Sequence, residues 1–473
     1  MAETPEGVRL AVIGAGPGGY AAAFLAADYG LPVTLIGADE NPGGVCLYRG
    51  CIPSKALLHL AKVIEESEAA ASWGVTFEKP RIDLDRVRAW KNDVVGKLTG
   101  GLGDLSKRRK VQYLRGTARF EGARSLSVGF DNGNTERVDF THAIIATGSS
   151  PAVIPGFDPD SPRVWDSTSA LDLPEVPPRL LVIGCGYIGL ELGSVYAALG
   201  SKVTVVEMLD SILPGVDGDL VRPLERKLQK SFAAIHTATK VKESFEQDED
   251  FQVTFEGAYS GTETFDRVLV AVGRKPLTKG LGLDAVRVST NERGFIQVNP
   301  SRETTEPGIY AIGDVAGEPL LAHKATHEGR AAVEAITGRH GVFEPQAIPA
   351  VIFTDPEIAW AGLTETEAKR SGKKVEVGRF PWAASGRSIT LGRTDGVTKV
   401  IVDPESKRVL GVGICGPGAG ELIAEAVLAI EMGATAQDLD LTIHPHPTLS
   451  ETIMEAAAAI YGTSTHIHRP RRG

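Results

Sequence analysis

The chain contains 473 residues, of which 42% are hydrophobic and 23% are charged, and its formal net charge is −10. This is the composition of a globular protein, with enough residues for about three domains. The negative charge and the lack of a long basic run argue against a nucleic-acid-binding protein. No apolar run approaches the length of about 18 residues that a membrane span needs, and the first ten residues lack a signal-peptide pattern. We therefore expect a cytoplasmic protein that does not bind a membrane.

The first predicted unit consists of a strand, a glycine-rich turn, a helix and a second strand. The first strand covers residues 8–13, the Ala-rich helix covers Tyr20–Tyr29, and the second strand covers Pro32–Ile36. The turn between them, GAGPGG, contains Gly14, Gly16 and Gly19. Such a unit, within about 30 residues, places the pyrophosphate of a dinucleotide at the N-terminus of the helix.

One position of this unit departs from the usual pattern. Gly37 stands where an acidic residue is expected to hold the ribose hydroxyls. Asp39 and Glu40 follow shortly, and either could supply the carboxylate. The alternative is that the ribose is held in a different way.

The stretch GGVCLYRGCIPSK, residues 43–55, contains Cys46 and Cys51, two of the four cysteines of the chain. Cys51 precedes an apolar run with helical spacing that extends to about Glu68, and Pro53 falls in the first helical turn. Two thiols beside the positive end of a helix indicate a redox pair with a stabilised thiolate. The alternative is a chance pair of buried cysteines. Cys185 and Cys415 are interpreted as packing residues.

The segment after this pair is expected to return to the first sheet. A helix is predicted over residues 81–110, interrupted by the glycines at 100, 101 and 103, and strands are predicted near 111–120, 125–130 and 136–140. An apolar strand then ends in Ala146, Thr147 and Gly148. Small residues at a strand end favour a close approach of the backbone to a ligand.

After a Pro-rich linker at 174–178, the first pattern is repeated. Strands are predicted over Leu180–Ile183 and Val203–Val206, with a helix over Leu190–Leu199 between them. The turn of this second unit, GCGYIG, contains Gly184, Gly186 and Gly189. Here the second strand does end in an acid, Glu207, which would accept hydrogen bonds from both ribose hydroxyls and repel a 2′-phosphate. The second unit is therefore predicted to bind NAD rather than NADP.

The next segment delivers further small and acidic residues to strand ends. A strand over about 265–272 ends at Gly273, and a buried strand from Gly308 delivers Asp314 at its carboxyl end, where ligands of open α/β sheets bind. A helix is predicted to begin at Leu321. From about Phe343 the pattern becomes α+β, which predicts a dimerisation domain. Its strands are expected at Ala350–Phe353, Lys374–Phe380, Thr398–Asp403 and Val409–Cys415, and its helices at 419–432 and 435–439.

The stretch HPHPTLSE near the C-terminus is a candidate catalytic base. His446 lies between two prolines and Glu451 follows one turn into the next predicted helix. A carboxylate bonded to one imidazole nitrogen fixes the tautomer and raises the basicity of the other nitrogen, as a general base for a thiol requires. His444 has no such neighbour in the sequence and is interpreted as structural. No metal site is expected.

These parts together predict an enzyme that transfers two electrons between a dithiol and a pyridine nucleotide. Thiolates transfer hydride to NAD poorly, so a flavin is needed as mediator. The first unit is therefore predicted to hold FAD and the second NAD. The fold class is α/β, with two Rossmann-like dinucleotide-binding domains and a C-terminal α+β dimerisation domain.

With GAGPGG, GGVCLYRGCIPSK, ATGS, GCGYIGLE, AIGDVAG, LAHKA and HPHPTLSE in this order, the chain resembles the flavoprotein disulfide reductases, a class of pyridine nucleotide-disulfide oxidoreductases. The resemblance extends from about Val8 to about Tyr461. It implies an FAD-binding domain in two parts, residues 1–150 and 277–345. It also implies an NAD-binding domain over 151–276 and a dimerisation domain over 346–473.

The resemblance also implies a role for each matching residue. Cys46 would meet the substrate, Cys51 would touch the flavin, and Lys55 would lie near the flavin and pair with Glu191. His446 and Glu451 would come from the second subunit of a homodimer. The implied FAD residues are Gly14, Gly16, Gly19, Gly43, Gly44, Lys55, Ala118, Thr147, Gly148, Ser149, Asp314, Leu321, Ala322 and His323. The implied NAD residues are Gly184, Gly186, Gly189, Glu207 and Gly273. Tyr187 would either cover the flavin as a lid or pack at the domain junction.

Within this family, the resemblance implies oxidation of a dihydrolipoyl group carried by an acyltransferase or carrier protein of a multienzyme complex, with reduction of NAD⁺. The alternative is a glutathione-reductase-like enzyme, which would carry basic residues for NADP where this chain has Glu207. A non-enzymatic FAD-bearing scaffold is a second alternative, disfavoured by the complete set of two cysteines, His446 and Glu451. Tyr48 and Arg49 replace the Asn-Val that is usual in the family, and they either tune the disulfide or fill space.

Overall fold

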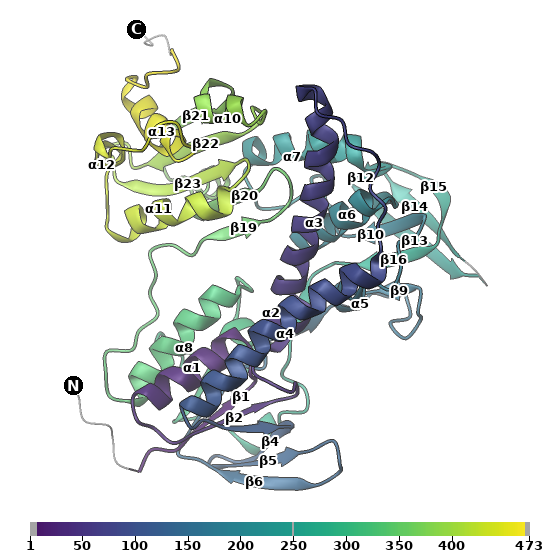
Figure 1. Ribbon diagram of the computed structural model, residues 1–473. Coiled ribbons are helices and arrows are strands. Elements are labelled where there is room, and N and C mark those ends of the chain that lie inside the picture. The colour runs from purple at the N-terminus through teal and green to yellow at the C-terminus, as the bar shows by residue number, and fades with distance from the viewer. Residues whose placement is uncertain (1–6, 248–249, 469–473) are drawn as a thin grey trace.

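The computed structural model describes residues 7–247 and 250–468. Three larger sheets, each covered by helices, form the molecule (Figure 1). The two parallel sheets carry the two predicted nucleotide units, and the third sheet is antiparallel and C-terminal. In the part of the chain that the structure describes, no helix is long and apolar enough to cross a membrane.

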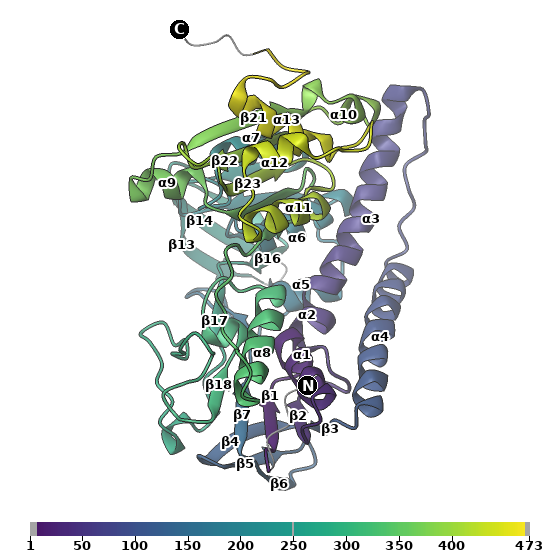
Figure 2. The ribbon, with the colours of Figure 1, turned by 90° about the vertical axis from the view of Figure 1, so that its left-hand side faces the viewer.

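The first sheet is parallel and contains five strands in the order β18-β7-β1-β2-β3. Its strands are β1 (Leu10–Ile13), β2 (Val33–Gly37), β3 (Gln112–Arg115), β7 (His142–Ile145) and β18 (Ile309–Ala311). Helices α1 (Pro17–Asp28) and α8 (Ala322–Ile336) pack against each other beside it (Figure 2). Because β18 pairs with β7, the chain returns to its first sheet after building the second one. This return brings Asp314 to the same sheet edge as the first glycine turn.

Three helices form an excursion that leads from the first sheet towards the C-terminal sheet and back to the first sheet (Figure 2). They are α2 (Gly44–Arg49), α3 (Cys51–Ala69) and α4 (Leu84–Arg108), with the short η1 (Ala70–Trp73) after α3. The expected interruption of the 81–110 helix by glycines is wrong, since α4 is continuous through Gly100, Gly101 and Gly103. A side chain at Gly103 would lie 2.1 Å from Asn41 Oδ1, so close packing explains at least that glycine.

A small antiparallel sheet, β4-β5-β6, lies below the first sheet in Figure 1. Its strands are β4 (Thr117–Gly122), β5 (Ser125–Gly129) and β6 (Thr135–Asp139). The single strand predicted near 111–120 is wrong, because these residues form two strands in two different sheets, β3 and β4. The chain changes direction at Gly116, where a Cβ would lie 2.6 Å from the carbonyl oxygen of Gly129.

The second parallel sheet has the order β12-β11-β10-β16-β9. Its strands are β9 (Val164–Trp165), β10 (Arg179–Ile183), β11 (Lys202–Val206), β12 (Ala234–His236) and β16 (Arg267–Val270). Helices α5 (Ser167–Asp172), α6 (Tyr187–Leu199) and α7 (Gly218–Ser231) belong to this region, as does a three-stranded sheet of β13 (Thr239–Glu246), β14 (Phe251–Gly257) and β15 (Gly261–Phe265). Strands β9, β12, β13 and β15 were not predicted from the sequence. A two-stranded ladder of β8 (Ser149–Pro151) and β17 (Arg274–Pro276) joins the two parallel sheets.

The C-terminal sheet has the order β19-β20-β23-β22-β21 and is antiparallel in each pairing. Its strands are β19 (Ala350–Ile352), β20 (Ile358–Gly362), β21 (Glu376–Pro381), β22 (Val397–Val402) and β23 (Val409–Cys415). Its helices are α9 (Glu365–Ser371), α10 (Gly386–Thr390), α11 (Ala419–Glu431), α12 (Ala436–Leu441) and α13 (Glu451–Tyr461). The predicted α+β pattern is confirmed, although β20, α9 and α10 were missed.

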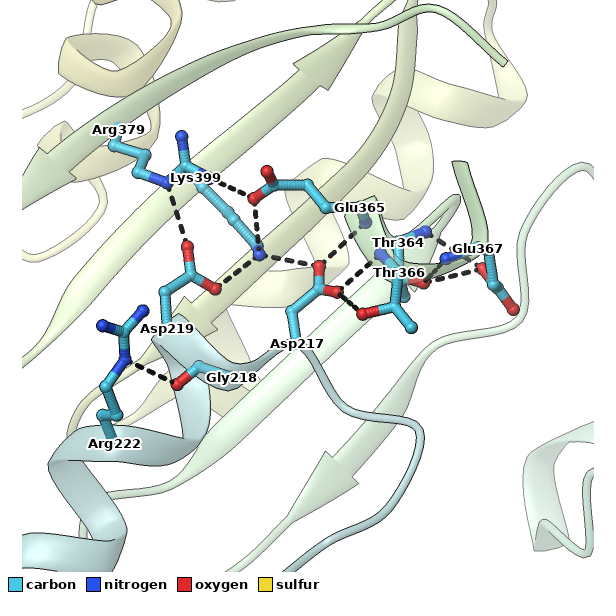
Figure 3. A network of polar contacts seen from close by, with 10 residues as sticks. All are labelled: Asp217, Gly218, Asp219, Arg222, Thr364, Glu365, Thr366, Glu367, Arg379 and Lys399. Atoms are coloured by element: carbon cyan, nitrogen blue, oxygen red, sulfur yellow. Dashed lines mark hydrogen bonds and ion pairs between the residues drawn. The ribbon is translucent and has the colours of Figure 1, made fainter. Parts of the chain in front are cut away.

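A buried ionic network joins the second nucleotide unit to the C-terminal sheet (Figure 3). Lys399 on β22 is 1% exposed, and its ammonium lies 2.7 Å from Asp217, 2.6 Å from Asp219 and 3.0 Å from Glu365. Arg379 also contacts the last two of these carboxylates. Although burial opposes it, the Lys399 ammonium helps to lower the pKa of Asp217 to about 2. Lys399 thus supplies the cation between these three acids, so the cluster is a link between domains rather than an open metal site.

Candidate active site

A cavity of about 490 Å³ opens between the first nucleotide unit, the two cysteines and the N-terminus of α6. It is lined by residues from β1, β2, α2, α3 and the turn after β18. The predicted site residues on its wall are Gly14, Gly16, Gly44, Cys46, Cys51, Lys55, Ala118, Thr147, Gly148, Ser149, Tyr187, Glu191, Asp314 and Ala322. Segments far apart in the sequence therefore meet around a single volume large enough for part of a dinucleotide.

The first glycine turn brings the backbone close to this cavity. Gly14 has φ of +103°, and a Cβ there would lie 2.2 Å from the carbonyl oxygen of Ala146. A Cβ at Gly19 would lie 1.8 Å from the carbonyl oxygen of Gly14. By contrast, a Cβ on Gly16 or Gly148 meets no protein atom within 4 Å. The first pair of glycines permits tight packing and the second pair leaves room for a ligand, which fits a dinucleotide at the start of α1.

Asp314 lies in the one-turn helix η3 (Gly313–Ala316) at the same edge of the sheet. Ser149 Oγ donates a hydrogen bond to Asp314 Oδ2 at 2.5 Å, and Arg274 Nε donates to Ser149 Oγ at 2.7 Å. The backbone of η3 is held by fully buried Glu328, whose carboxylate accepts the N–H of Gly313 at 2.6 Å. The sequence reading missed Arg274 and Glu328; the pairing of β17 with β8 brings Arg274 here, and the chain's return to the first sheet brings Glu328.

The two thiols are in hydrogen-bonding contact at the junction of α2 and α3. Cys51 is the first residue of α3, and the Sγ of Cys46 donates to the Sγ of Cys51 at 2.7 Å. This hydrogen bond lowers the pKa of Cys51 to about 7, against the opposing effect of burial and with the help of the Lys55 charge. The same contact raises the pKa of Cys46. A lowered pKa favours the thiolate form, so this contact agrees with the stabilised thiolate expected at the start of the helix.

Lys55, one turn after Cys51, pairs with Glu191 of the second nucleotide unit. Lys55 Nζ lies 2.8 Å from Glu191 Oε2, which also accepts from Ser54 Oγ at 3.1 Å. The other carboxylate oxygen accepts the N–H of Phe353 at 2.9 Å, and the ring of Phe353 lies 4.4 Å from Lys55 Nζ. The expected pairing of Lys55 with Glu191 is confirmed. The contribution of Phe353, from the loop after β19, was not evident from sequence.

Other predicted FAD residues are sequence neighbours of lining residues but do not line the cavity themselves. Gly43 donates its N–H to the carbonyl of Ala15 at 2.8 Å and precedes α2. Leu321 precedes α8, and the ring of His323 shares a hydrogen bond of 2.8 Å with the carbonyl of Pro349. Gly19, Gly43, Leu321 and His323 are not among the residues that line the cavity.

The second glycine turn has nearly the same backbone as the first. Gly184 has φ of +105°, and a Cβ at Gly189 would lie 2.2 Å from the carbonyl oxygen of Gly184. The carboxylate of Glu207 accepts the N–H of Cys185 at 2.8 Å and that of Leu209 at 2.9 Å. The predicted NAD residues Gly184, Gly186, Gly189, Glu207 and Gly273 lie outside the lining of the cavity, whereas Tyr187 belongs to that lining and is 40% exposed.

His446 and Glu451 form the predicted pair. The Nδ1 of His446 lies 2.8 Å from Glu451 Oε1, and the N–H of Thr448 donates to Glu451 Oε2 at 2.7 Å. Against the effect of burial, these contacts lower the pKa of Glu451. The side chain of His446 is 72% exposed, and neither residue lines the cavity of its own chain.

His444 has a carboxylate partner, so the expectation that it has none is wrong. Its Nε2 lies 2.9 Å from Glu425 Oε1 on α11, and its Nδ1 contacts the carbonyl of Thr442 at 2.8 Å. The side chain is buried, with both nitrogens engaged, so a structural role for His444 agrees with these contacts. Glu425 is 19 positions away in the sequence, which is why local spacing did not reveal it.

Comparisons with known proteins agree with this geometry. Residues 8–329 match the family described as pyridine nucleotide-disulphide oxidoreductase, and residues 348–457 match the dimerisation domain of the same family. The dihydrolipoyl dehydrogenase of Vibrio cholerae is 47% identical over 461 residues, covering 97% of each chain. The dihydrolipoyl dehydrogenase of Thermus scotoductus is 50% identical over 462 residues, covering 97% of this chain and 98% of its own.

Solved structures show the same fold. LpdA from Mycobacterium tuberculosis has a TM-score of 0.89 at 27% identity, covering 95% of this chain and 99% of its own. The HOCl-induced flavoprotein disulfide reductase RclA from Escherichia coli has a TM-score of 0.84 at 28% identity, with the same coverage. From its sequence matches, its paired nucleotide units and its adjacent thiols, this chain belongs to the pyridine nucleotide-disulphide oxidoreductases.

Proposed function

We propose that the chain is a dihydrolipoyl dehydrogenase that uses FAD and NAD⁺. It oxidises a dihydrolipoyl group through the Cys46–Cys51 pair and reduces NAD⁺ to NADH. The observation that carries this proposal is the meeting of the two thiols, Lys55 and Glu191 with the first glycine turn around one cavity. The names of relatives that are 47% and 50% identical over nearly the whole chain support the same reaction.

The cysteines exchange disulfides with the substrate. In the oxidised enzyme, one substrate thiol gives its proton to His446 and its sulfur attacks Cys46, so a bond to Cys46 forms while the Cys46–Cys51 bond breaks and leaves Cys51 as a thiolate. The second substrate sulfur then attacks the substrate sulfur already bound to Cys46, and its proton passes to the departing Cys46, which becomes a thiol. The cyclic lipoyl disulfide leaves, and the enzyme keeps a thiol and a thiolate.

The surroundings of the cysteines fit these roles. The hydrogen bond from Cys46 and the Lys55 charge hold Cys51 as the thiolate. When bound, FAD accepts the electron pair of the dithiol and passes it to NAD⁺ as a hydride. Glu191 keeps the Lys55 ammonium in place, because it is buried and accepts three hydrogen bonds. One substrate proton is released to solvent for each NADH formed.

A homodimer completes the site in this proposal. His446 is exposed and lies outside the cavity lining of its own chain, so it would act on the cysteines of a second copy. Exposed apolar side chains on α11, at its end, on α12 and before His446 would suit a subunit interface: Leu428, Met432, Leu441 and Ile443 are 63%, 76%, 70% and 96% exposed. The match of residues 348–457 to a dimerisation domain supports this arrangement. We also propose the division into FAD, NAD, FAD and dimerisation segments given above, and a lipoyl-bearing component of a multienzyme complex as partner.

The test is to mix the purified protein with dihydrolipoamide and NAD⁺ and to follow absorbance at about 340 nm, where NADH absorbs. Cys46→Ser should remove turnover and leave the flavin bound, since Cys46 bonds to the substrate. Ser72→Ala, in the exposed η1 just after α3, is the matched control and should leave the rate unchanged. Retained turnover in Cys46→Ser would remove the disulfide from the mechanism.

The glutathione-reductase-like alternative predicts a different result in a parallel assay. Glu207 directly follows the second strand of the proposed NAD unit and accepts the N–H of Cys185 in the glycine turn, so its carboxylate would repel the 2′-phosphate of NADP there. Reduction of glutathione disulfide driven by NADPH, without NADH formation from dihydrolipoamide, would overturn the proposal in favour of that alternative.

A further inference from the structure

The two places where this chain departs from its family pattern, Gly37 and the Tyr48-Arg49 pair, meet in the structure. Both side chains of the pair bind the turn that follows β2. Arg49 forms two parallel hydrogen bonds to the carboxylate of Asp39, at 2.7 and 3.0 Å. The Tyr48 hydroxyl accepts from the N–H of Asn41 at 3.1 Å and lies 3.2 Å from its carbonyl oxygen. The residues between the cysteines therefore hold this turn rather than merely fill space.

The position of Gly37 is closed to any side chain. A Cβ there would lie 2.6 Å from the Cβ of Ala15 and 2.9 Å from the hydroxyl of Tyr113. That hydroxyl donates to the carbonyl of Asp39 at 2.7 Å and so takes part in the fold of the turn. A carboxylate at the usual position would collide with both neighbours. If an acid holds the ribose in this chain, it comes from another position.

Asp39 is in the right place to supply that acid. It follows the end of β2 by two residues and lines the cavity, together with Gly14, Gly16 and Arg49. Its side chain is 17% exposed. Glu40, the other candidate, is exposed and is not part of the cavity wall. This difference favours Asp39 over Glu40 as the residue that supplies the carboxylate.

The pairing with Arg49 leaves Asp39 able to accept further hydrogen bonds. A carboxylate has about four lone-pair sites, and the guanidinium uses one on each oxygen. One site on each oxygen is left, which matches the two hydroxyls of a ribose. The bidentate contact also fixes the plane of the carboxylate, although Asp39 lies in a turn instead of at a strand end.

We infer that Asp39, oriented by Arg49, accepts the ribose hydroxyls of the adenosine half of FAD in place of the missing acid at Gly37. This inference rests on the proposed binding of FAD to the first unit. Arg49 is a positioning residue, since it acts through Asp39. Arg49 is the last residue of α2, the helix that also carries Cys46. The same helix would therefore position both the adenosine end of the cofactor and one of the redox cysteines.

The test measures FAD binding to the apoprotein, without turnover. Wild type, Asp39→Asn and the control Glu40→Gln are each titrated with FAD and with an FAD analogue that lacks the 2′-hydroxyl of the adenosine ribose. We expect wild type to bind FAD about tenfold more tightly than the analogue, as for the loss of one hydrogen bond to a charged group. Asp39→Asn should bind FAD about tenfold more weakly and discriminate little between the two ligands. Glu40→Gln should resemble wild type on both counts.

An unchanged preference for FAD over the analogue in Asp39→Asn would overturn the inference, because a merely structural ion pair would weaken both ligands equally. Arg49→Met should also reduce the preference, since Asp39 is then free to rotate; an unchanged preference there would remove its positioning role. If wild-type apoprotein does not bind FAD at all, the proposed function fails, and that result is distinct from either of these.

Discussion

The glycine turns of the two nucleotide units have nearly the same backbone, and the units differ in whether an acid directly follows the second strand. Gly14 and Gly184 have φ of +103° and +105°, and a Cβ there would lie 2.2 Å from the carbonyl oxygen of Ala146 or 2.5 Å from that of Ala271, each just after the neighbouring strand of its sheet. The second unit ends its second strand in Glu207, whereas the first ends in Gly37. The glycine turn is set by backbone sterics and cannot move along the chain. A ribose contact is made by a side chain, so its position can change.

The two candidate acids are also held by different means. Glu207 accepts two backbone N–H groups, from Cys185 and Leu209, and thus is oriented by its own turn. Asp39 is oriented by a side chain, Arg49, from the helix that carries a redox cysteine. The second unit is therefore self-contained in this respect, and the first unit depends on the cysteine segment.

The largest effect is expected from alanine at the third glycine of each turn. A Cβ at Gly19 would lie 1.8 Å from the carbonyl oxygen of Gly14, and one at Gly189 would lie 2.2 Å from that of Gly184. Relief of either clash moves a helix away from its turn, at a cost of about 3 kcal/mol, or roughly a hundredfold in binding. We expect Gly19→Ala to be purified without flavin. Gly189→Ala should keep the flavin and lose NADH affinity.

These outcomes are measured by the flavin absorbance of the purified proteins and by titration with NADH. Gly96→Ala, in the exposed part of α4 where a Cβ meets no atom within 4 Å, is the control for a glycine substitution as such. Loss of flavin from Gly189→Ala would show that the two units do not bind their ligands separately.

A smaller effect is expected from Glu207→Gln, which removes the charge but keeps the shape. NADH affinity should fall about tenfold, because a charged acceptor of the ribose hydroxyls is lost. The ratio of NADPH to NADH affinity should rise, since a 2′-phosphate is no longer repelled. Titrations with both nucleotides measure this ratio, and Glu243→Gln on exposed β13 is the matched control. An unchanged ratio would mean that Glu207 only supports its own turn.

The comparison also explains what the sequence could predict. Three features were recognisable from sequence, because each depends on local spacing or backbone geometry. They are the two nucleotide units, the cysteine pair of Cys46 on α2 and Cys51 on α3, and the His446–Glu451 pair. Arg274, Glu328 and Phe353 were missed, since they reach the site only through pairings between distant segments. The acid for the first ribose could not be chosen from sequence, because Asp39 and Glu40 are neighbours and only their packing separates them.

The smallest effect is expected where the two units are joined, at Lys55 of α3 and Glu191 of α6. The Lys55 charge contributes to the low pKa of Cys51, after the larger effect of the hydrogen bond from Cys46. Lys55→Met should therefore raise that pKa above about 7 and reduce the thiolate fraction at neutral pH. The rate of alkylation of the reduced protein by iodoacetamide, measured against pH, should shift to higher pH and fall a few-fold at neutrality.

Ser54→Ala is the matched control, because it removes a hydrogen bond to Glu191 without changing a charge. Its alkylation profile should stay close to that of wild type. If Lys55→Met also leaves the profile unchanged, the N-terminus of α3 and Cys46 stabilise the thiolate without help from this pair. The contact between the units would then position the second unit only, and the first unit would set the reactivity of its cysteines alone.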